Sequence, residues 1–302
     1  MFPGQGTQKP GMLNALGSSI DKVNEVFEIA NDVTGRDVRE LCLSASAEEL
    51  VKTENTQVAV TAMNLAYLKL LDLEGVKPDI VLGHSLGQFS AFAAAGVLTT
   101  KQVFEVVQKR AELMGNIKRE GMLCTILGMD YMTVEQICHE INPNRDNLVV
   151  ALYNTPNQIV IGGDPDYVLK AEEACKAKGA LRTVPVKVSN AFHTPLMKEM
   201  EEEFSSFIDK TVLSAPKCRL MLNCKADYAE SVDDIKKEII EQCCHTVNWC
   251  DGVKKVISDN SEIIFAEVGV GKVLTGMLRS IDKDQHMMMM SDSTQFEKFL
   301  TL

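Results

Sequence analysis

The sequence contains no long apolar segment, because no run approaches the roughly 18 consecutive apolar residues that span a bilayer. It also begins without the basic stretch and apolar core that mark a signal peptide. Internal repeats and low-complexity linkers are absent as well. The 302 residues, 45% hydrophobic and 24% charged, have the composition of an ordinary globular protein with one large or two smaller domains. We therefore expect a cytoplasmic protein with no membrane partner.

Positive charge is also scarce, since 31 Lys and Arg residues face 42 Asp and Glu residues, which gives a formal net charge of −11. A nucleic-acid-binding protein would present a basic face, so no nucleic acid is expected as a partner. An anionic ligand could still bind, but only at a local cationic site with an identifiable Arg or Lys.

The nine cysteines show neither paired CxxC motifs nor regular spacing. This favours reduced thiols in the cytosol over a disulfide framework. One cluster, Cys243, Cys244, His245 and Cys250, contains residue types that bind zinc. Adjacent cysteines on a helical turn point in different directions, however, and no second pair accompanies them. We therefore expect no metal site.

The segments on either side of Ser85 indicate an α/β domain with a parallel sheet. Residues 57–76 predict a mostly buried helix, and the short apolar run 80–82 suits a buried parallel strand. An Ala-rich helix is expected directly after Ser85. Later in the chain, we expect helices near 195–210 and 232–243 and strands near 219–222 and 263–268.

A different pattern begins near residue 120. Four strands are predicted there at 122–128, 147–154, 158–163 and 182–188, and two helices at 133–141 and 164–179. The resulting order β-α-β-β-α-β is that of the ferredoxin-like split βαβ unit. We therefore expect residues 120–189 to be a small domain inserted into a large α/β domain formed by residues 1–119 and 190–302.

The most informative stretch is GHSLG, residues 83–87, which has the form G-x-S-x-G between the predicted strand and the predicted helix. Such a sharp turn presents the serine hydroxyl at the C-terminal end of a strand, where α/β active sites usually lie. Ser85 is therefore a candidate nucleophile, and the N–H of Leu86 is a candidate oxyanion-hole donor. The alternative is a serine that only caps the helix.

A nucleophilic serine needs a base. The histidines of the chain are His84, His139, His193, His245 and His286. The turn should aim His84 away from Ser85. His193 is favoured because the chain returns there from the predicted insertion to the large domain, so its side chain could reach a cleft between them. The alternative is a purely structural histidine.

Four segments occur along the chain in the order FPGQGTQ, GHSLGQFSA, NAFHTPL and EVGVGKVLTGML. Together they resemble the malonyl-CoA:acyl-carrier-protein transacylase family, the acyltransferases of fatty-acid and polyketide synthesis. The resemblance extends from Pro3 to Leu278, which is nearly the whole chain. It implies an α/β fold with a hydrolase-like parallel-sheet domain and an inserted ferredoxin-like small domain, as the order of predicted elements also indicates.

The resemblance implies roles for matching positions. Ser85 resembles the nucleophile of the family, and His193 its general base and acid. The opening loop is similar to the family's oxyanion loop, so Gln5 would supply a second backbone N–H beside that of Leu86. Arg110, in QKRAELM, matches the arginine that pairs with the free carboxylate of the malonyl group. This pair would favour malonyl over acetyl, because an acetyl group leaves the guanidinium unpaired.

Three more positions match the family pattern. Asn154 in YNTPNQ and Asn248 in TVNW match residues that orient the histidine through neutral groups instead of a carboxylate. Phe192, beside His193, resembles the malonyl-selecting form of its motif.

The implied reaction is ping-pong transfer of malonyl from malonyl-CoA to the phosphopantetheine thiol of acyl carrier protein, through a malonyl-serine intermediate. Both thioester partners are substrates, so no cofactor is expected, and we expect the enzyme to act as a monomer. Fatty-acid and polyketide synthesis both stay open as pathways. Candidate basic residues for docking the carrier protein are Lys118, Arg119, Lys176, Lys178 and Lys187.

Two other functions fit parts of the pattern. An acyl hydrolase or thioesterase would use Ser85 and His193 in the same way but admit water in the second step. Arg110 argues against it, because this residue selects an acyl group and does nothing to favour water. A non-catalytic docking subunit would be expected to have lost Ser85, His193 or Arg110.

The chain opens almost directly on the predicted oxyanion loop. Family members usually place a short apolar strand before this loop, inside the central sheet. Only Met1 and Phe2 precede it here. We therefore expect a shortened strand, a neighbouring strand with unpaired backbone groups and a less firmly held Gln5.

Overall fold

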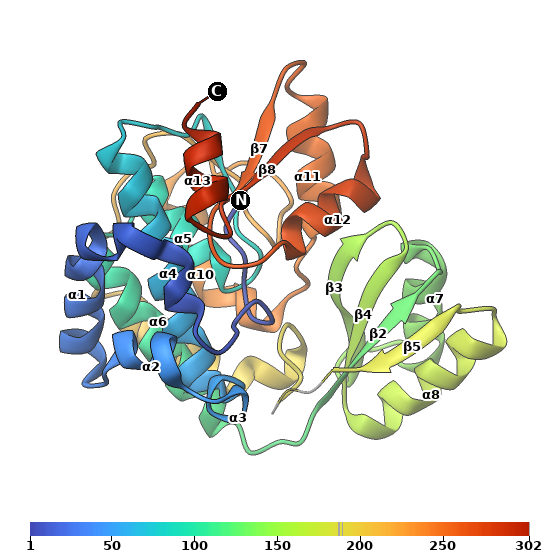
Figure 1. Cartoon of the computed structure of the whole chain (residues 1–302). Coiled ribbons are helices and arrows are strands. Elements are labelled where there is room, and N and C mark those ends of the chain that lie inside the picture. Colours follow the sequence, from blue (N-terminus) through green and yellow to red (C-terminus); the bar gives the residue numbers. More distant parts are fainter. Residues whose placement is uncertain (187, 189, 302) are drawn as a thin grey trace.

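The computed structural model describes residues 1–186, 188 and 190–301, so the candidate docking residue Lys187 lies outside the described residues. The chain forms a mixed α/β structure with parallel and antiparallel strand pairs. Figure 1 shows a sheet flanked by two helices beside a larger, helix-rich body. We call residues 122–185 the small lobe and the rest of the described chain the large lobe. Within the described residues, no helix combines the length and apolar character needed to cross a bilayer.

The helices of the large lobe, with η for the 3-10 type, are η1 (Met12–Val23), α1 (Asn24–Thr34), α2 (Val38–Ser44), α3 (Ala47–Leu50), α4 (Thr53–Leu73), α5 (Gly87–Ala94), α6 (Thr100–Asn116), η2 (Pro195–Met200), α9 (Glu201–Ile208), α10 (Val232–Glu241), η3 (Gln242–Cys244), α11 (Trp249–Ser258), α12 (Val273–Ile281) and α13 (Ser293–Phe299). Its strands are β1 (Ile80–Val81), β6 (Arg219–Leu220), β7 (Ile264–Glu267) and β8 (His286–Met289). The small lobe contains β2 (Met122–Leu127), α7 (Tyr131–Ile141), β3 (Leu148–Thr155), β4 (Gln158–Gly163), α8 (Pro165–Ala177) and β5 (Arg182–Pro185).

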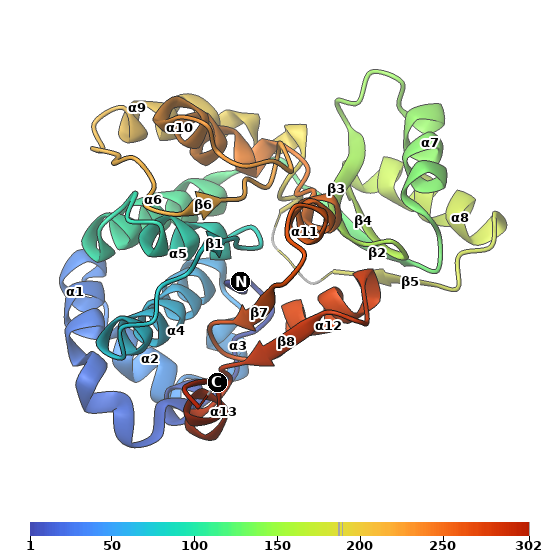
Figure 2. The same cartoon turned by 90° about the horizontal axis from the view of Figure 1, so that it is seen from above.

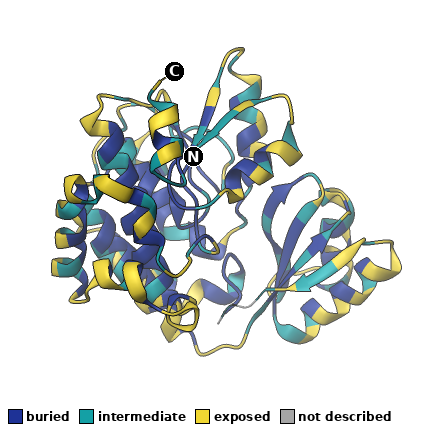
Figure 3. Cartoon of the chain, viewed as in Figure 1, coloured by how far each residue is buried: buried dark blue, intermediate teal, exposed yellow. Residues whose placement is uncertain are grey.

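The helices around the candidate nucleophile agree with the sequence prediction. The helix predicted at 57–76 is α4, which is buried along most of its length (Figure 3). The Ala-rich helix after Ser85 is α5. Helix α6 begins at a capping box, in which Thr99 Oγ1 accepts the Gln102 N–H at 3.3 Å and Gln102 Oε1 accepts the Thr99 N–H at 2.9 Å. This cap sets the start of the helix that carries Arg110.

Met1 and Phe2 lie between two parallel strand pairs, β1–β6 and β7–β8 (Figure 2). On one side, the Phe2 N–H donates to the Leu82 carbonyl at 2.9 Å and the His84 N–H donates to the Phe2 carbonyl at 3.1 Å. On the other side, the Val268 N–H donates to the Met1 carbonyl at 2.8 Å. Met1 and Phe2 therefore connect β1 to β7 and lead directly into the opening loop.

The small lobe is a four-stranded antiparallel sheet in the order β3-β4-β2-β5. Successive side chains of a strand alternate between its two faces. In β2, Cys124 and Ile126 pack with residues of α7 and α8, whereas Leu123 packs with Leu196 of η2 in the large lobe. All six predicted elements are present, although the strand predicted at 182–188 ends at Pro185.

Strand β3 joins the small lobe to the large one. The Tyr153 N–H donates to the Val247 carbonyl at 2.9 Å, and the Val247 N–H donates to the Ala151 carbonyl at 3.0 Å. These parallel contacts bring the end of β3, with Asn154, next to the segment between η3 and α11. Residues far apart in the sequence therefore converge where the two lobes meet.

Candidate active site

Ser85 occupies a strained turn between β1 and α5. Its φ of 50° is in the left-handed region, which a residue other than glycine adopts only when the surroundings enforce it. The turn packs closely on the N-terminal residues, because a Cβ on Gly87 would lie only 2.0 Å from the Phe2 carbonyl oxygen. The predicted strand–turn–helix context of GHSLG is therefore present, and it projects the serine hydroxyl away from the strand.

The Ser85 hydroxyl meets His193, as the sequence predicted. Ser85 Oγ lies 2.7 Å from His193 Nε2, and His193 Nδ1 lies 2.8 Å from the Gln242 backbone carbonyl oxygen. A carbonyl oxygen can only accept, so the proton of the neutral imidazole is on Nδ1. Nε2 is then the basic nitrogen that faces the serine. This is the geometry of a nucleophile and its general base.

His193 is buried, and its environment favours the neutral ring. Burial and the nearby positive charge of Arg110 lower the pKa of His193 from 6.5 to about 3, although the hydrogen bond to Gln242 acts in the opposite direction. The imidazole is consequently unprotonated at neutral pH and free to accept the serine proton.

The orientation of His193 corrects two sequence predictions. Asn154 Oδ1 lies 2.7 Å from His84 Nε2, and Asn248 Nδ2 donates to the Cys224 carbonyl at 2.7 Å, so neither side chain is hydrogen-bonded to His193. The Gln242 carbonyl holds the ring instead. Gln242 was missed because a backbone acceptor has no sequence signature. The available signal was its place at the end of the predicted helix 232–243, since the last carbonyls of a helix lack intrahelical partners.

His84 packs against elements on either side of the turn. Its half-buried ring packs edge-on against Trp249, with ring centroids 5.5 Å apart, and desolvation lowers its pKa. Through His84 and Asn154, strand β3 of the small lobe contacts the turn that carries Ser85.

Arg110 lies beside Ser85 and is fully buried. Its Nη1 donates to Gln57 Oε1 at 2.7 Å, whereas the contacts of Nη2 with Ser85 Oγ and Gln242 Oε1 are long, at 3.5 Å and 3.4 Å. Among the described residues, Nε has no hydrogen-bond partner. The guanidinium also lies 5.5 Å from the centroid of the Phe89 ring. Arg110 is therefore a buried cation beside Ser85 with a donor that no described residue uses, and its role in binding an anionic group stays a prediction.

The opening loop lies against the same turn. A Cβ on Gly4 would be 3.6 Å from the backbone nitrogen of Leu86. The loop is held by Thr7 Oγ1, which donates to the Gly4 carbonyl at 2.9 Å, and by Asn64 Nδ2, which donates to the Pro3 carbonyl at 2.9 Å. No hydrogen bond from the N–H of Gln5 or of Leu86 is found within the described part of the chain. Both N–H groups are thus available, and their service as an oxyanion hole stays a prediction.

Phe192 is buried in the main hydrophobic core next to His193. Its role in selecting the acyl group stays a prediction. In the cluster of Cys243, Cys244, His245 and Cys250, the Cys243 carbonyl accepts the His193 N–H at 2.8 Å, and the His245 side chain is exposed. No group of three or more metal-binding side chains is found among the residues that the structure describes.

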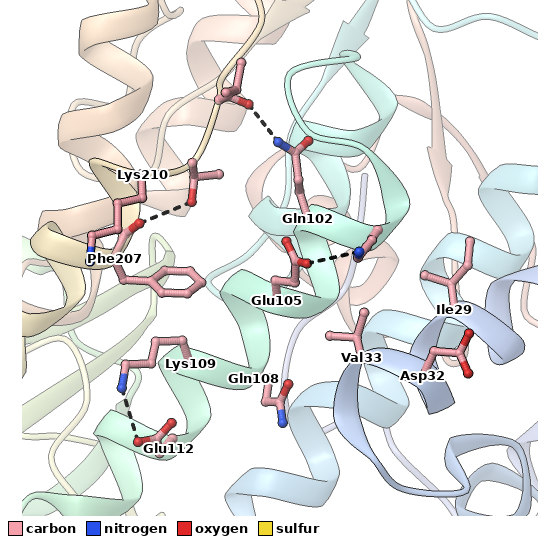
Figure 4. Close-up of a pocket in the computed structure, with 13 residues that line it drawn as sticks. Ile29, Asp32, Val33, Gln102, Glu105, Gln108, Lys109, Glu112, Phe207 and Lys210 are labelled. Atoms are coloured by element: carbon pink, nitrogen blue, oxygen red, sulfur yellow. Dashed lines mark hydrogen bonds and ion pairs between the residues drawn. The ribbon is translucent and has the colours of Figure 1, made fainter.

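A surface groove of about 920 Å³ lies between α1, α6 and α9 (Figure 4). Lys109 lines it and pairs with Glu112 at 3.2 Å and with Glu203 at 2.5 Å. Its neighbour Arg110 instead points into the protein, toward Gln57 and Ser85. The groove and the Ser85 site therefore lie on different faces of α6, and the groove contains none of the residues around Ser85.

Known proteins resemble the chain over nearly its whole length. The acyl transferase domain family matches residues 1–287. A malonyl CoA-acyl carrier protein transacylase of Bacillus subtilis is 33% identical over 299 residues, which cover 98% of this chain and 94% of the relative. A solved structure of malonyl-CoA:acyl carrier protein transacylase from Xanthomonas oryzae pv. oryzae has a TM-score of 0.93 at 31% identity, with 99% of this chain and 96% of that chain covered. A solved complex of a type II PKS acyl-carrier protein with its malonyl-transacylase has a TM-score of 0.94 at 31% identity, with 99% and 97% covered.

Proposed function

Because the chain belongs to the malonyl CoA-acyl carrier protein transacylase family of acyl transferases, we propose that it transfers malonyl from malonyl-CoA to the phosphopantetheine thiol of an acyl carrier protein. The observation that carries this proposal is the position of Arg110. Its buried guanidinium lies 3.5 Å from Ser85 Oγ and has spare donors, which suits an acyl group with a free carboxylate.

In the first half-reaction, His193 Nε2 takes the proton of Ser85 Oγ while the oxygen attacks the thioester carbonyl carbon. The negative charge of the tetrahedral intermediate is stabilised by the N–H groups of Gln5 and Leu86. The C–S bond then breaks, and the CoA thiolate leaves with the proton held by His193. The Gln242 carbonyl keeps the imidazole in the required tautomer throughout.

In the second half-reaction, His193 takes the proton of the phosphopantetheine thiol, whose sulfur attacks the carbonyl carbon of malonyl-Ser85. The C–O bond to Ser85 breaks, and Oγ recovers its proton from His193. Arg110 binds the malonyl carboxylate in both halves, and Phe192 limits the size of the acyl group. Neither half oxidises or reduces anything, so the proposal requires no cofactor.

We extend the proposal to the domain division, the cellular compartment and the oligomeric state. The strand order β3-β4-β2-β5 supports a ferredoxin-like insertion at residues 120–189 within a hydrolase-like domain of residues 1–119 and 190–302. Nine free thiols suit the reducing cytoplasm. The side chains named above all belong to one chain, so a monomer can perform both half-reactions. Light scattering on the purified protein tests whether it is a monomer.

Docking of the carrier protein is proposed on exposed basic residues. Lys118 and Arg119 are exposed, at the approach to the small lobe. Lys176 and Lys178 are each paired with a carboxylate, Glu172 at 2.6 Å and Glu140 at 3.6 Å, which leaves less of their charge for a partner. Lys118 and Arg119 are therefore the stronger candidates.

Intact-mass analysis after incubation with malonyl-CoA tests the proposed function. A single malonyl adduct should form on the wild type and be absent from Ser85→Ala. The adduct should persist in buffer and disappear when phosphopantetheinylated carrier protein is added. Rapid loss of the adduct in buffer alone would instead identify an acyl hydrolase, and an adduct on the alanine variant would exclude Ser85 as the nucleophile.

A further inference from the structure

The turn that carries Ser85 contains two buried polar backbone groups that the turn itself does not satisfy. The Ser85 N–H and the Gly83 carbonyl lie on either side of His84, at the point where the chain leaves β1. Because Ser85 has a left-handed φ of 50°, this conformation needs support from outside the turn. A relaxed turn would move Oγ away from His193.

One side chain contacts both groups. Asn223 Oδ1 accepts the Ser85 N–H at 2.8 Å, and Asn223 Nδ2 donates to the Gly83 carbonyl at 2.8 Å. Within residues 1–186, 188 and 190–301, neither backbone group has another hydrogen-bond partner. An amide is suited to this position because it offers an acceptor and a donor side by side. Asn223 follows β6, which pairs with β1, so the sheet carries it to the turn.

Asn223 is itself held rigidly. Its side chain is 3% exposed, its N–H donates to Glu238 Oε1 at 2.7 Å, and its carbonyl accepts the Asn248 N–H at 2.9 Å. Glu238, which is 4% exposed, also accepts the Cys224 N–H at 3.1 Å and 3.2 Å. A buried carboxylate therefore fixes the backbone on both sides of the Asn223 side chain, which allows the amide to act as a rigid clamp.

We propose that Asn223 is a positioning residue of the transfer reaction: its amide clamps the turn so that Ser85 Oγ points at His193 Nε2, and Glu238 supports the clamp. This inference rests on the proposed role of Ser85 as the nucleophile. Asn223 does not touch the reacting atoms and acts only through the Ser85 backbone.

The test compares Asn223→Ala and Asn223→Asp with the wild type. Alanine removes both hydrogen bonds, whereas aspartate keeps an acceptor for the Ser85 N–H but sets an oxygen against the Gly83 carbonyl. Asn142→Ala is the matched control, because Asn142 is also buried and its Oδ1 accepts two backbone N–H groups, of Asn147 at 2.9 Å and Leu148 at 3.1 Å. It lies at the end of α7 in the small lobe, away from the turn.

Two rates are measured on each folded variant, together with its thermal unfolding midpoint. One is labelling of Ser85 by a fluorophosphonate probe, in which the serine oxygen displaces fluoride from phosphorus. The other is formation of malonyl-enzyme from malonyl-CoA. Both Asn223 variants should slow both reactions by roughly 10- to 100-fold, the cost of a misplaced nucleophile, while the KM for malonyl-CoA stays close to that of the wild type.

Asn142→Ala should lower the unfolding midpoint without slowing either reaction. Wild-type rates in both Asn223 variants, or equal slowing in the Asn142 variant, would overturn the clamp. If the wild type reacts with the fluorophosphonate probe but forms no malonyl adduct, the proposed function fails, and the labelling rates still decide the role of Asn223.

Discussion

Ser85 Oγ lies 2.7 Å from His193 Nε2, although 108 positions separate the two residues in the sequence. The contact forms because the turn after β1 and the segment before η2 meet at the boundary between the lobes. The Gln242 carbonyl fixes the tautomer at Nδ1, and burial together with the charge of Arg110 lowers the pKa of His193 and favours the neutral ring.

Replacing His193 by Ala should slow malonyl-enzyme formation at pH 7 by roughly 10²- to 10⁴-fold, because the serine loses its general base. Single-turnover mixing with malonyl-CoA and intact-mass analysis measures the rate. His245→Ala serves as the control, since that histidine is exposed and its Nδ1 contacts the Glu241 carbonyl at 2.9 Å. Acylation of the His193 variant at the rate of the control would show that another group takes the proton.

The rate of Ser85 labelling by a fluorophosphonate should stay high below pH 6.5, the ordinary pKa of histidine. Burial and Arg110 lower the pKa of His193 to about 3, so the base is neutral above that pH, and the acidic limb of the profile should lie near it. Arg110→Met removes the repelling charge and should move the limb to higher pH, while burial keeps it below 6.5. An acidic limb at 6.5 in the wild type would contradict the buried, neutral imidazole.

Arg110→Ala should reduce the preference for malonyl-CoA over acetyl-CoA by roughly 10- to 100-fold, since a hydrogen bond to a charged group contributes about 1.5–3 kcal/mol. The ratio of kcat/KM for the two thioesters measures it. Lys109→Ala is the control from the same helix, because that side chain faces the groove of Figure 4 and pairs with Glu112 and Glu203. A ratio that changes equally in both variants would remove Arg110 from acyl selection.

Gln242→Ala keeps the carbonyl that orients His193 but removes the side chain, whose Nε2 donates to the Ser85 carbonyl at 3.1 Å and whose Oε1 accepts from Arg110. The free energy of unfolding should fall by about 1–3 kcal/mol, because buried polar groups lose partners. The pH of the acidic limb of Ser85 labelling should not change.

Asn248→Ala should leave Ser85 labelling at the wild-type rate, since the Asn248 side chain donates to the Cys224 carbonyl. A shifted acidic limb in that variant would restore the role first predicted for Asn248.

Gly87→Ala should destabilise the fold by about 1–3 kcal/mol, because the added methyl group would meet the backbone of Phe2, which cannot move without breaking its strand contacts. Gly115→Ala, in α6, has open space around the added methyl group and should stabilise by about 0.5–1 kcal/mol. Urea unfolding of both variants gives the comparison. Equal effects would mean that the turn does not pack on the N-terminal residues as described.

The small lobe was predictable in all six of its elements because their signals are local. Short apolar runs predict β2 and β4, and Asp164 with Pro165 marks the start of α8. The elements that were not predicted are η1, α1, α2, α3, α11, α12, α13 and strand β8. Strand β8, a short methionine-rich segment, exists because β7 supplies its hydrogen-bonding partner.

Local sequence also predicted Ser85 as the candidate nucleophile, since GHSLG between an apolar run and an Ala-rich segment is typical of a sharp strand-to-helix turn. The surroundings of Ser85 depend on contacts between distant segments. The partner of His193 is a backbone carbonyl, and any residue at position 242 would present one. Asn223 meets Ser85 only because β6 pairs with β1. Short motifs thus predict which side chains are candidates to react, whereas the orientation of these side chains depends on which backbone groups the packed sheet brings within hydrogen-bonding distance.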